Sequence, residues 1–146
     1  MASKYDDRIF QLNQNAPLIL WLQGGPGGSS LFGLFIEHGP FYVTDQLELM
    51  PRSTAWSLPY NVLYIDQPVG TGFSFTKNDR GYATNQEMVA NDLYEAMKQF
   101  YALFPSLLQQ DLYVTGESYA GNVTKSILVA LTRVTTYSLT FEIDSD

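Results

Sequence analysis

Apolar residues along the chain gather in short runs that each end at a cluster of turn-forming residues. Residues 18–22 (LILWL) lead into a glycine-rich loop, residues 61–65 (NVLYI) lead into a second loop, and residues 112–115 (LYVT) stop at Gly116. Runs of this length are too short for helices and are typical of strands buried within a parallel sheet. We therefore predict three strands, of which the first is buried on both faces.

The stretch between the second and third strands has the pattern of an amphipathic helix. Thr84 and Glu87 have the spacing of a capping box, in which each side chain accepts a hydrogen bond from the other residue's backbone amide. Pro105 ends the stretch. Apolar positions at helical spacing mark one face of this helix: Val89, Leu93, Ala96 or Met97, Phe100 and Phe104.

Two shorter patterns lie between the first and second strands. Residues 31–36 form an apolar segment that Ser29 or Ser30 can cap and that the Gly-Pro pair at 39–40 terminates. Residues 41–50 alternate weakly between apolar and polar, which predicts a short hairpin or an edge strand.

The residues after the third strand have the outline of a nucleophile elbow. In such a strand-to-helix turn the serine adopts a strained backbone conformation that exposes its hydroxyl, and the positions two before and two after it must be small. Ser118 is the serine here, and Gly116 and Ala120 meet the size requirement. The amide of Tyr119 then lies at a helix N-terminus, where it can stabilise an oxyanion. The alternative interpretation is an ordinary strand followed by a turn.

The helix predicted after this turn is followed by a different pattern. Residues 137–143 alternate between apolar and polar, which predicts a half-exposed strand. The apolar side of the helix carries Val123, Ile127, Leu131 and Val134.

Strands that alternate with helices predict an α/β fold with a mostly parallel sheet and flanking helices. The loops after the strands then share one edge of the sheet, where ligands bind in such folds. Residues 24–28 contain four glycines, which let the backbone turn sharply and leave amides free to face a ligand. No internal repeat or linker is visible, so we predict a single domain over residues 1–146.

Composition and charge exclude several classes of function. The 146 residues are 45% hydrophobic, 14% aromatic and 16% charged, as in a globular domain, and the net charge of −7 argues against nucleic acid and anionic membranes as partners. The sequence has no cysteine, which excludes disulfides and thiolate ligands. It contains neither the apolar core of a signal peptide nor an apolar run near the ~20 residues of a membrane span. We predict no metal or other cofactor, and leave compartment and oligomeric state open.

Four segments occur in the order and spacing of the serine carboxypeptidases: residues 20–30 (LWLQGGPGGSS), 37–40 (EHGP), 65–74 (IDQPVGTGFS) and 116–121 (GESYAG). Over about residues 15–121 the chain thus resembles this peptidase family, whose fold is the α/β-hydrolase fold. The form with Gln23 and Gly28 is most similar to the vitellogenic-like carboxypeptidase branch. Four segments in register are more specific than any one of them alone.

The resemblance implies an enzyme that removes C-terminal residues from peptides or proteins through an acyl-enzyme. Ser118 would be the nucleophile, and the amides of Gly25 and Tyr119 would form the oxyanion hole.

The resemblance also implies a site for the substrate's terminal carboxylate. Gln23, the amide of Gly24, Glu37 and Glu117 would form it, although family members usually carry asparagine at the position of Gln23. Two close carboxyls can share a proton, and the protonated one can donate a hydrogen bond to an anionic chain end. We therefore expect recognition to weaken as pH rises.

The chain also departs from the family, which places its triad aspartate and histidine after the serine. The one histidine, His38, lies before Ser118, and we interpret it as a turn or rim residue. The acidic residues of the C-terminal tail match no family position, and residues 122–146 diverge. We therefore expect a partial α/β-hydrolase domain, truncated at both ends, that lacks the triad aspartate and histidine and is inactive alone.

Two alternatives to the peptidase hypothesis stay open. One is a non-catalytic protein or truncated isoform that keeps a pocket for peptide C-termini. The other is a fragment of a carboxypeptidase-like acyltransferase, which would use the same Ser118 acyl-enzyme.

Overall fold

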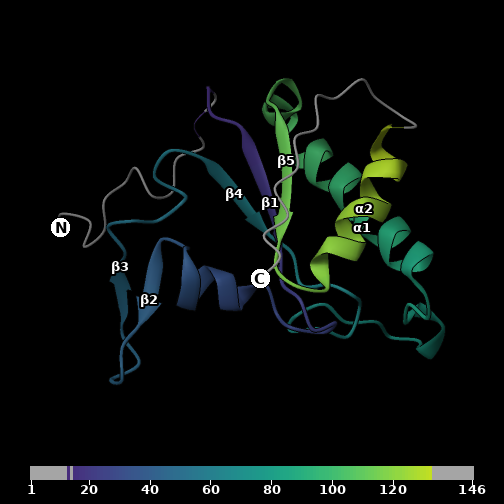
Figure 1. Ribbon diagram of the computed structural model, residues 1–146, viewed down its shortest axis with the longest axis horizontal. Coiled ribbons are helices and arrows are strands. Elements are labelled where there is room, and N and C mark those ends of the chain that lie inside the picture. Colours follow the sequence, from purple (N-terminus) through teal and green to yellow (C-terminus); the bar gives the residue numbers. More distant parts are fainter. Residues whose placement is uncertain (1–12, 14, 133–146) are drawn as a thin grey trace.

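The computed structural model describes residue 13 and residues 15–132. Figure 1 shows a small sheet in the centre, with a hairpin at one end of the molecule and two helices at the other. The elements in chain order are β1 (Leu18–Leu22), the π-helical turn η2 (Gly33–Glu37), β2 (Phe41–Val43), β3 (Leu49–Pro51), β4 (Asn61–Tyr64), the 3₁₀ turn η3 (Asp79–Gly81), α1 (Gln86–Leu103), the 3₁₀ turn η4 (Pro105–Gln109), β5 (Leu112–Gly116) and α2 (Ala120–Thr132).

β1 is the central strand of a parallel sheet with the order β4-β1-β5. Its middle residue, Leu20, is paired with Leu63 of β4 and Val114 of β5. All five residues of β1 are buried. The predicted strand with two buried faces is therefore confirmed, and its length also matches.

β4 was predicted to be buried, and this expectation is only partly correct. Asn61 is buried, whereas the other three residues of the strand are half-exposed. Among the described strands β4 pairs with β1 alone, so it lies at the edge of this three-stranded sheet. An apolar run by itself does not distinguish a central strand from an edge strand.

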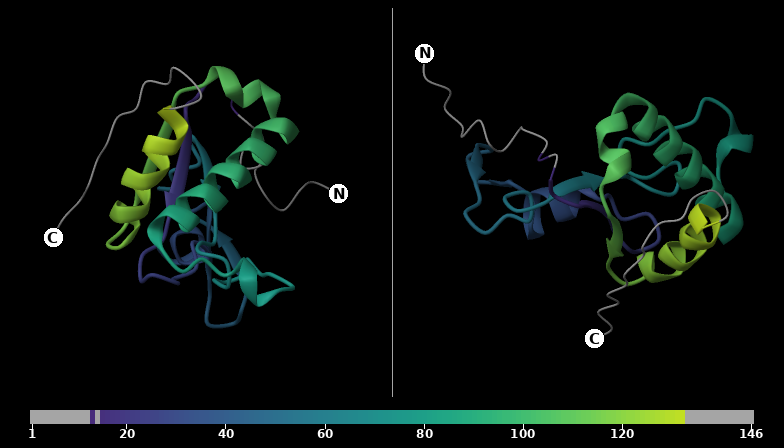
Figure 2. Two further views of the ribbon diagram at one scale, coloured as in Figure 1. Left: turned by 90° about the vertical axis from the view of Figure 1, so that its right-hand side faces the viewer. Right: turned by 90° about the horizontal axis from the view of Figure 1, so that it is seen from above.

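Helices α1 and α2 pack against each other, α2 also packs on β5, and Figure 1 and the right view of Figure 2 place both helices away from the hairpin. Val123 and Ile127 face the core as predicted. Val134 and the predicted strand at residues 137–143 lie outside the described residues, as does the side chain of Leu131. One core cluster joins both helices to the sheet: Leu18, Leu20, Leu22, Leu93, Met97, Tyr101, Leu107, Leu112, Val114, Ala120, Val123 and Ile127.

The predicted start of α1 was wrong by one residue. Asn85 is the N-cap, and its side chain accepts from the Met88 amide at 2.9 Å, in place of the pairing expected between Thr84 and Glu87. The predicted apolar face is otherwise confirmed, because Leu93 and Met97 are buried and Val89 and Phe100 pack against the core, whereas Phe104, which follows the last helical residue, is 40% exposed. The buried residues of the helix are Ala90, Leu93, Met97 and Tyr101.

The hairpin predicted for residues 41–50 is present as antiparallel β2 and β3. The segment before it begins as predicted, because Ser29 Oγ accepts from the Leu31 amide at 3.2 Å. It then widens into the π-helical turn η2, which ends where the His38 amide donates to the Gly33 carbonyl. None of the described helices is both long and apolar enough to cross a membrane.

Candidate active site

Ser118 lies in the turn between β5 and α2 with a left-handed backbone, φ +55°. This region of conformational space is unfavourable for residues other than glycine, so the surrounding structure must hold the turn in place. It does so through backbone hydrogen bonds: the Glu117 amide donates to the Leu22 carbonyl of β1, and the Gly121 amide donates to the Ser118 carbonyl. The predicted strand–serine–helix elbow is therefore present.

The residues around the elbow must be small because backbone lies directly against them. A Cβ on Gly116 would lie 2.5 Å from the Leu22 carbonyl oxygen and 2.6 Å from Ala120 Cβ. A Cβ on Gly24 would lie 2.7 Å from the Glu117 carbonyl oxygen and 2.9 Å from Ser118 Cβ. The glycine loop after β1 and the elbow after β5 are therefore in direct contact.

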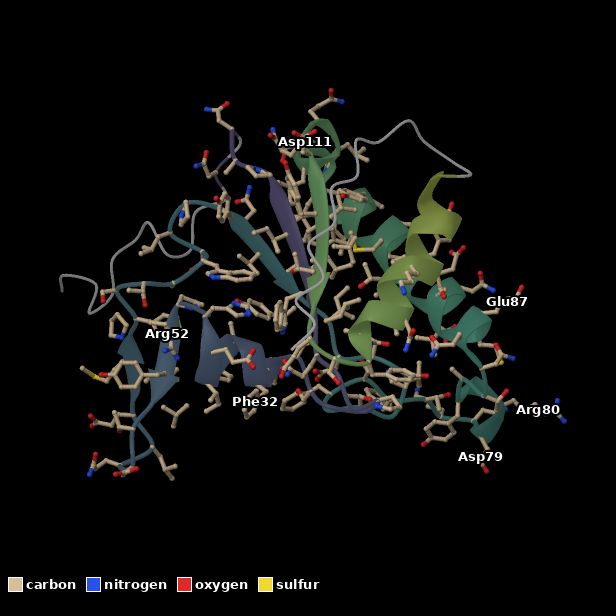
Figure 3. All side chains as sticks on the ribbon, viewed as in Figure 1. Phe32, Arg52, Asp79, Arg80, Glu87 and Asp111 are labelled. Atoms are coloured by element: carbon tan, nitrogen blue, oxygen red, sulfur yellow. The ribbon has the colours of Figure 1, made fainter. Side chains whose placement is uncertain are left out.

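A cleft of about 600 Å³ opens where these two loops meet. Figure 1 shows the loops after β1 and β4 at the same end of the sheet as the start of α2, and Figure 3 places Phe32 at this end. The cleft includes five of the seven predicted site residues; Glu37 and Tyr119 lie outside its lining. The lining consists of Gln23, Gly24, Gly25, Gly28, Ser29, Leu31, Phe32, Glu117 and Ser118.

Two backbone amides near Ser118 are available as donors. Gly25 has a positive φ of 118°, and neither its amide nor that of Tyr119 has an acceptor among the described residues. The Tyr119 amide nitrogen lies 3.3 Å from the position of a Cβ on Gly24, so it is close to the glycine loop. The side chain of Tyr119 is held from α1, where Gln86 Nε2 donates to its hydroxyl.

Gln23 connects the glycine loop to an acidic pair. Its Nε2 donates to Glu117 Oε2 at 2.6 Å, and its Oε1 accepts from Trp21 Nε1 at 3.0 Å, so both ends of the amide are fixed. Burial, and then the negative charge of Glu117, raise the pKa of Glu37 above its usual value. The three side chains predicted to bind a carboxylate therefore interact with one another, although they come from three separate segments.

His38 differs from the turn or rim residue that the sequence predicted. Its backbone ends η2, but its ring is enclosed by aromatic rings: it stacks on Trp56 with centroids 4.0 Å apart and meets the edge of Trp21 at 4.3 Å. Its Nδ1 lies 3.1 Å from the Tyr64 hydroxyl. Burial, followed by the nearby Arg52 charge, lowers the pKa of His38 to about 4. His38 is not part of the cleft lining.

Asp66 organises the loops around the cleft, a role that our sequence analysis missed. Its carboxylate accepts from the Ser29 hydroxyl at 2.7 Å, the Ser30 amide at 2.8 Å and the Phe73 amide at 2.8 Å. It thereby joins the loop after β1 to the loop after β4. The available signal was its position, since an acidic residue directly after a strand shares a sheet edge with the glycine loop.

A strained serine between a parallel strand and a helix, with a glycine loop from the neighbouring strand beside it, defines the α/β-hydrolase fold. The chain belongs to the serine carboxypeptidase family, because the model of that family matches residues 9–139. It is similar to a crystal structure of Kex1(delta)p, a prohormone-processing carboxypeptidase from Saccharomyces cerevisiae. The TM-score is 0.77 and the identity 33%, over 82% of this chain and 26% of that chain.

Sequence relatives agree with this family. The chain is 57% identical to the probable serine carboxypeptidase CPVL of Mus musculus over 108 residues, which are 74% of this chain and 23% of that protein. It is 52% identical to the venom serine carboxypeptidase of Apis mellifera over 118 residues, 81% of this chain and 25% of that protein. The chain thus spans about a quarter of the length of the curated relatives it matches.

Proposed function

We propose that this chain carries the nucleophile, the oxyanion hole and the carboxylate-recognition site of a serine-type carboxypeptidase. One observation carries the proposal: Ser118 has a left-handed backbone, and its Cβ lies against the backbone of Gly24 at the edge of the cleft. The exposed Ser118 and the unpaired amides of Gly25 and Tyr119 lie in the two loops that meet here, which supports a role in acyl transfer.

In the proposed reaction, Ser118 Oγ attacks the carbonyl carbon of the last peptide bond. The amides of Gly25 and Tyr119 donate to the oxygen that becomes negative in the tetrahedral intermediate. Collapse of the intermediate breaks the C–N bond, the proton lost by the Ser118 hydroxyl passes to the leaving nitrogen, and the C-terminal residue departs as an amine, leaving an acyl ester on Ser118. Water then hydrolyses the ester and restores the hydroxyl.

The substrate's terminal carboxylate would bind Gln23, the Gly24 amide and the pair formed by Glu37 and Glu117. Because the pKa of Glu37 is raised, its carboxyl keeps a proton to higher pH than usual and can donate it to the carboxylate. Recognition is present while that proton is bound and is lost as pH rises through the raised pKa. Binding of the substrate's terminal carboxylate should therefore be stronger under mildly acidic conditions.

The hydroxyl proton of Ser118 needs a base, and His38 does not supply one. Its ring is enclosed by Trp21 and Trp56, its Nδ1 faces Tyr64, and His38 is not among the residues that line the cleft. We therefore expect little or no turnover of peptides by the 146-residue chain, because a serine without an imidazole partner is a poor nucleophile.

Acylation by an activated ester tests Ser118 as a nucleophile separately from the missing base. After incubation with p-nitrophenyl acetate, mass spectrometry should find a single acetyl adduct on Ser118 in the wild-type chain, and this adduct should be absent in Ser118→Ala. Ser53→Ala, a change in a turn away from the cleft, should leave it intact. Acetylation spread over other hydroxyls, or equal in Ser118→Ala, would contradict the proposed elbow function.

Peptide hydrolysis tests the second part of the proposal. With a blocked dipeptide at about pH 5, the wild-type chain should show no more product than Ser118→Ala. Robust hydrolysis that requires Ser118 would keep the nucleophile but show that another group accepts its proton.

A second candidate function is binding of peptide C-termini without catalysis. It is favoured by the cluster of Gln23, Glu37 and Glu117, which is assembled within this chain and needs no base. Calorimetric titration at pH 5 should then show at least about tenfold tighter binding of a dipeptide acid than of its amide, the loss of one charge-assisted interaction. Equal affinities would remove both this candidate and the proposed carboxylate site.

A further inference from the structure

Two buried polar atoms beside the acidic pair have no hydrogen-bond partner among the described residues. They are Glu37 Oε2 and His38 Nε2. The two atoms lie 3.8 Å apart. Leaving buried polar atoms unpaired is costly, and a movement of about 1 Å would bring these two to the ordinary N–H···O distance. A small movement would therefore let these two atoms form a hydrogen bond.

The imidazole ring is held so that its Nε2 faces Glu37. Trp56 stacks on one face of the ring with an interplanar angle of 18°, and Trp21 meets it at 76°. On the other side of the ring, Nδ1 lies 3.1 Å from the Tyr64 hydroxyl. The ring is thus held by contacts from β1, β4 and the segment after β3.

The Tyr64 hydroxyl is a hydrogen-bond partner of Nδ1, and the direction of this bond depends on which ring nitrogen carries the hydrogen. Burial raises the pKa of the Tyr64 phenol, so the hydroxyl keeps its proton and can donate it to Nδ1. A neutral imidazole that accepts at Nδ1 carries its hydrogen on Nε2. The ring is neutral at mildly acidic pH, because burial and the Arg52 charge lower the pKa of His38 to about 4.

Among the described residues, two further charged groups act on this pair, Arg52 and Glu117. Arg52 is the cation nearby, and its guanidinium is engaged with the carbonyls of Phe35, Ile36 and Gly39. Glu117 is the other acid next to Glu37. Arg52 therefore acts on His38 through its charge, while Nε2–H is left to face Glu37.

We propose that His38 is a positioning residue for carboxylate recognition, in which the Tyr64 hydroxyl donates to Nδ1 and Nε2–H donates to Glu37 Oε2. This inference rests on the proposed function of Glu37. The hydrogen bond occupies Oε2 and leaves Oε1 for the proton shared with Glu117 and offered to the substrate. A donor to Glu37 also favours its ionised form, so His38 limits how far the pKa of Glu37 rises and thereby sets the upper pH limit of binding.

Titration of a blocked dipeptide acid and its amide between pH 4 and pH 7 tests this role on the wild-type chain and two variants. His38→Phe keeps an aromatic ring in the cage but removes the donor. The midpoint, which is the pH at which half of the preference for the acid is lost, should move upward by about 1 pH unit in this variant. His38→Gln places an amide donor near Nε2, and its midpoint should stay within a few tenths of a unit of wild type. A purely structural role would lower affinity at every pH and leave the midpoint in place.

The outcomes separate this inference from the proposed function. If the wild-type chain binds acid and amide equally at every pH, the carboxylate site fails and His38 has no role in it. If the wild-type chain prefers the acid but His38→Phe has the wild-type midpoint, only the role of His38 is overturned.

Nitrogen NMR gives a test that needs no variant. The sequence has a single histidine, so ¹⁵N-histidine labelling produces signals from one ring alone. At pH 6 the shifts should report a neutral ring with its hydrogen on Nε2. A neutral ring with the hydrogen on Nδ1 would overturn the proposed direction of the hydrogen bonds.

Discussion

The two ends of the molecule position their site residues by different physical means. At the sheet end, β1 is fully buried, and the glycine loop meets the Ser118 elbow through backbone contacts. At the hairpin end, β3 has no buried residue, and Figure 3 shows Arg52 beside η2. Its guanidinium donates to three carbonyls there, while aromatic rings enclose His38.

This difference has a consequence for the two halves of the site. The nucleophile half depends on apolar burial and on close approach that only glycine permits. The carboxylate half depends on polar and aromatic contacts around Glu37 and His38, which respond to pH. We therefore expect the sheet end to be sensitive to changes of side-chain volume and the hairpin end to be sensitive to protonation.

The largest effect should come from a cavity in β1. Leu20 is fully buried between β4 and β5, so Leu20→Ala should lower the free energy of unfolding by about 2–5 kcal/mol. Leu49, which is 40% exposed in β3, provides the control, and Leu49→Ala should cost about 0.5 kcal/mol or less. Urea denaturation measures both, and equal losses would remove the distinction between the two ends.

The next effect should come from the elbow glycine. Gly116→Ala places a methyl group against the Leu22 carbonyl and Ala120, which should cost about 1–3 kcal/mol and displace Ser118. Gly121 is the matched control, because a Cβ there meets nothing within 4 Å, and Gly121→Ala should stabilise α2 by about 0.5 kcal/mol. Thermal unfolding of the two variants should shift in opposite directions. A Gly116→Ala chain as stable as wild type would show that the elbow has room to relax.

A smaller effect, specific to the hairpin end, should appear in the pH dependence of the free energy of unfolding. The pKa of His38 falls from 6.5 to about 4 on folding. Its contribution to stability is therefore present above pH 6.5 and is lost as pH falls toward 4, because the unfolded chain binds a proton that the folded chain does not. Between pH 7 and pH 5 the wild-type chain should lose about 2 kcal/mol more than His38→Gln.

Denaturation curves at pH 7, 6 and 5 measure this difference. Stability that falls in parallel for wild type and His38→Gln would mean that the ring titrates normally in the folded chain. Leu20→Ala should keep the wild-type pH dependence, since its cavity lies in the sheet.

The elements themselves were largely predictable from local sequence. β1 and the hairpin agree with the apolar patterns, and the end of α1 before Pro105 was also correct. The errors concern positions at which contacts with neighbouring residues or strands decide the structure. Asn85 replaces Thr84 as the cap of α1, and β4 is half-exposed because it borders β1 alone among the described strands.

The site shows the same division. The strained serine and its small neighbours were predictable because an elbow has local steric requirements. The roles of Asp66 and Trp21 were not, since their partners lie in other loops or depend on side-chain orientation. Asp66 binds two segments that only the fold brings together, and Trp21 orients Gln23 through its indole nitrogen.

The sequence alone determined the family, the order of strands and helices, and the residue at the centre of the elbow, because these depend on local spacing and on the size of single residues. Only the tertiary structure decided that His38 lies in an aromatic cage next to Glu37, and that Gln23 joins Trp21 to Glu117. These contacts depend on side-chain packing between distant segments, and linear spacing carries no information about which way a buried ring or amide will face.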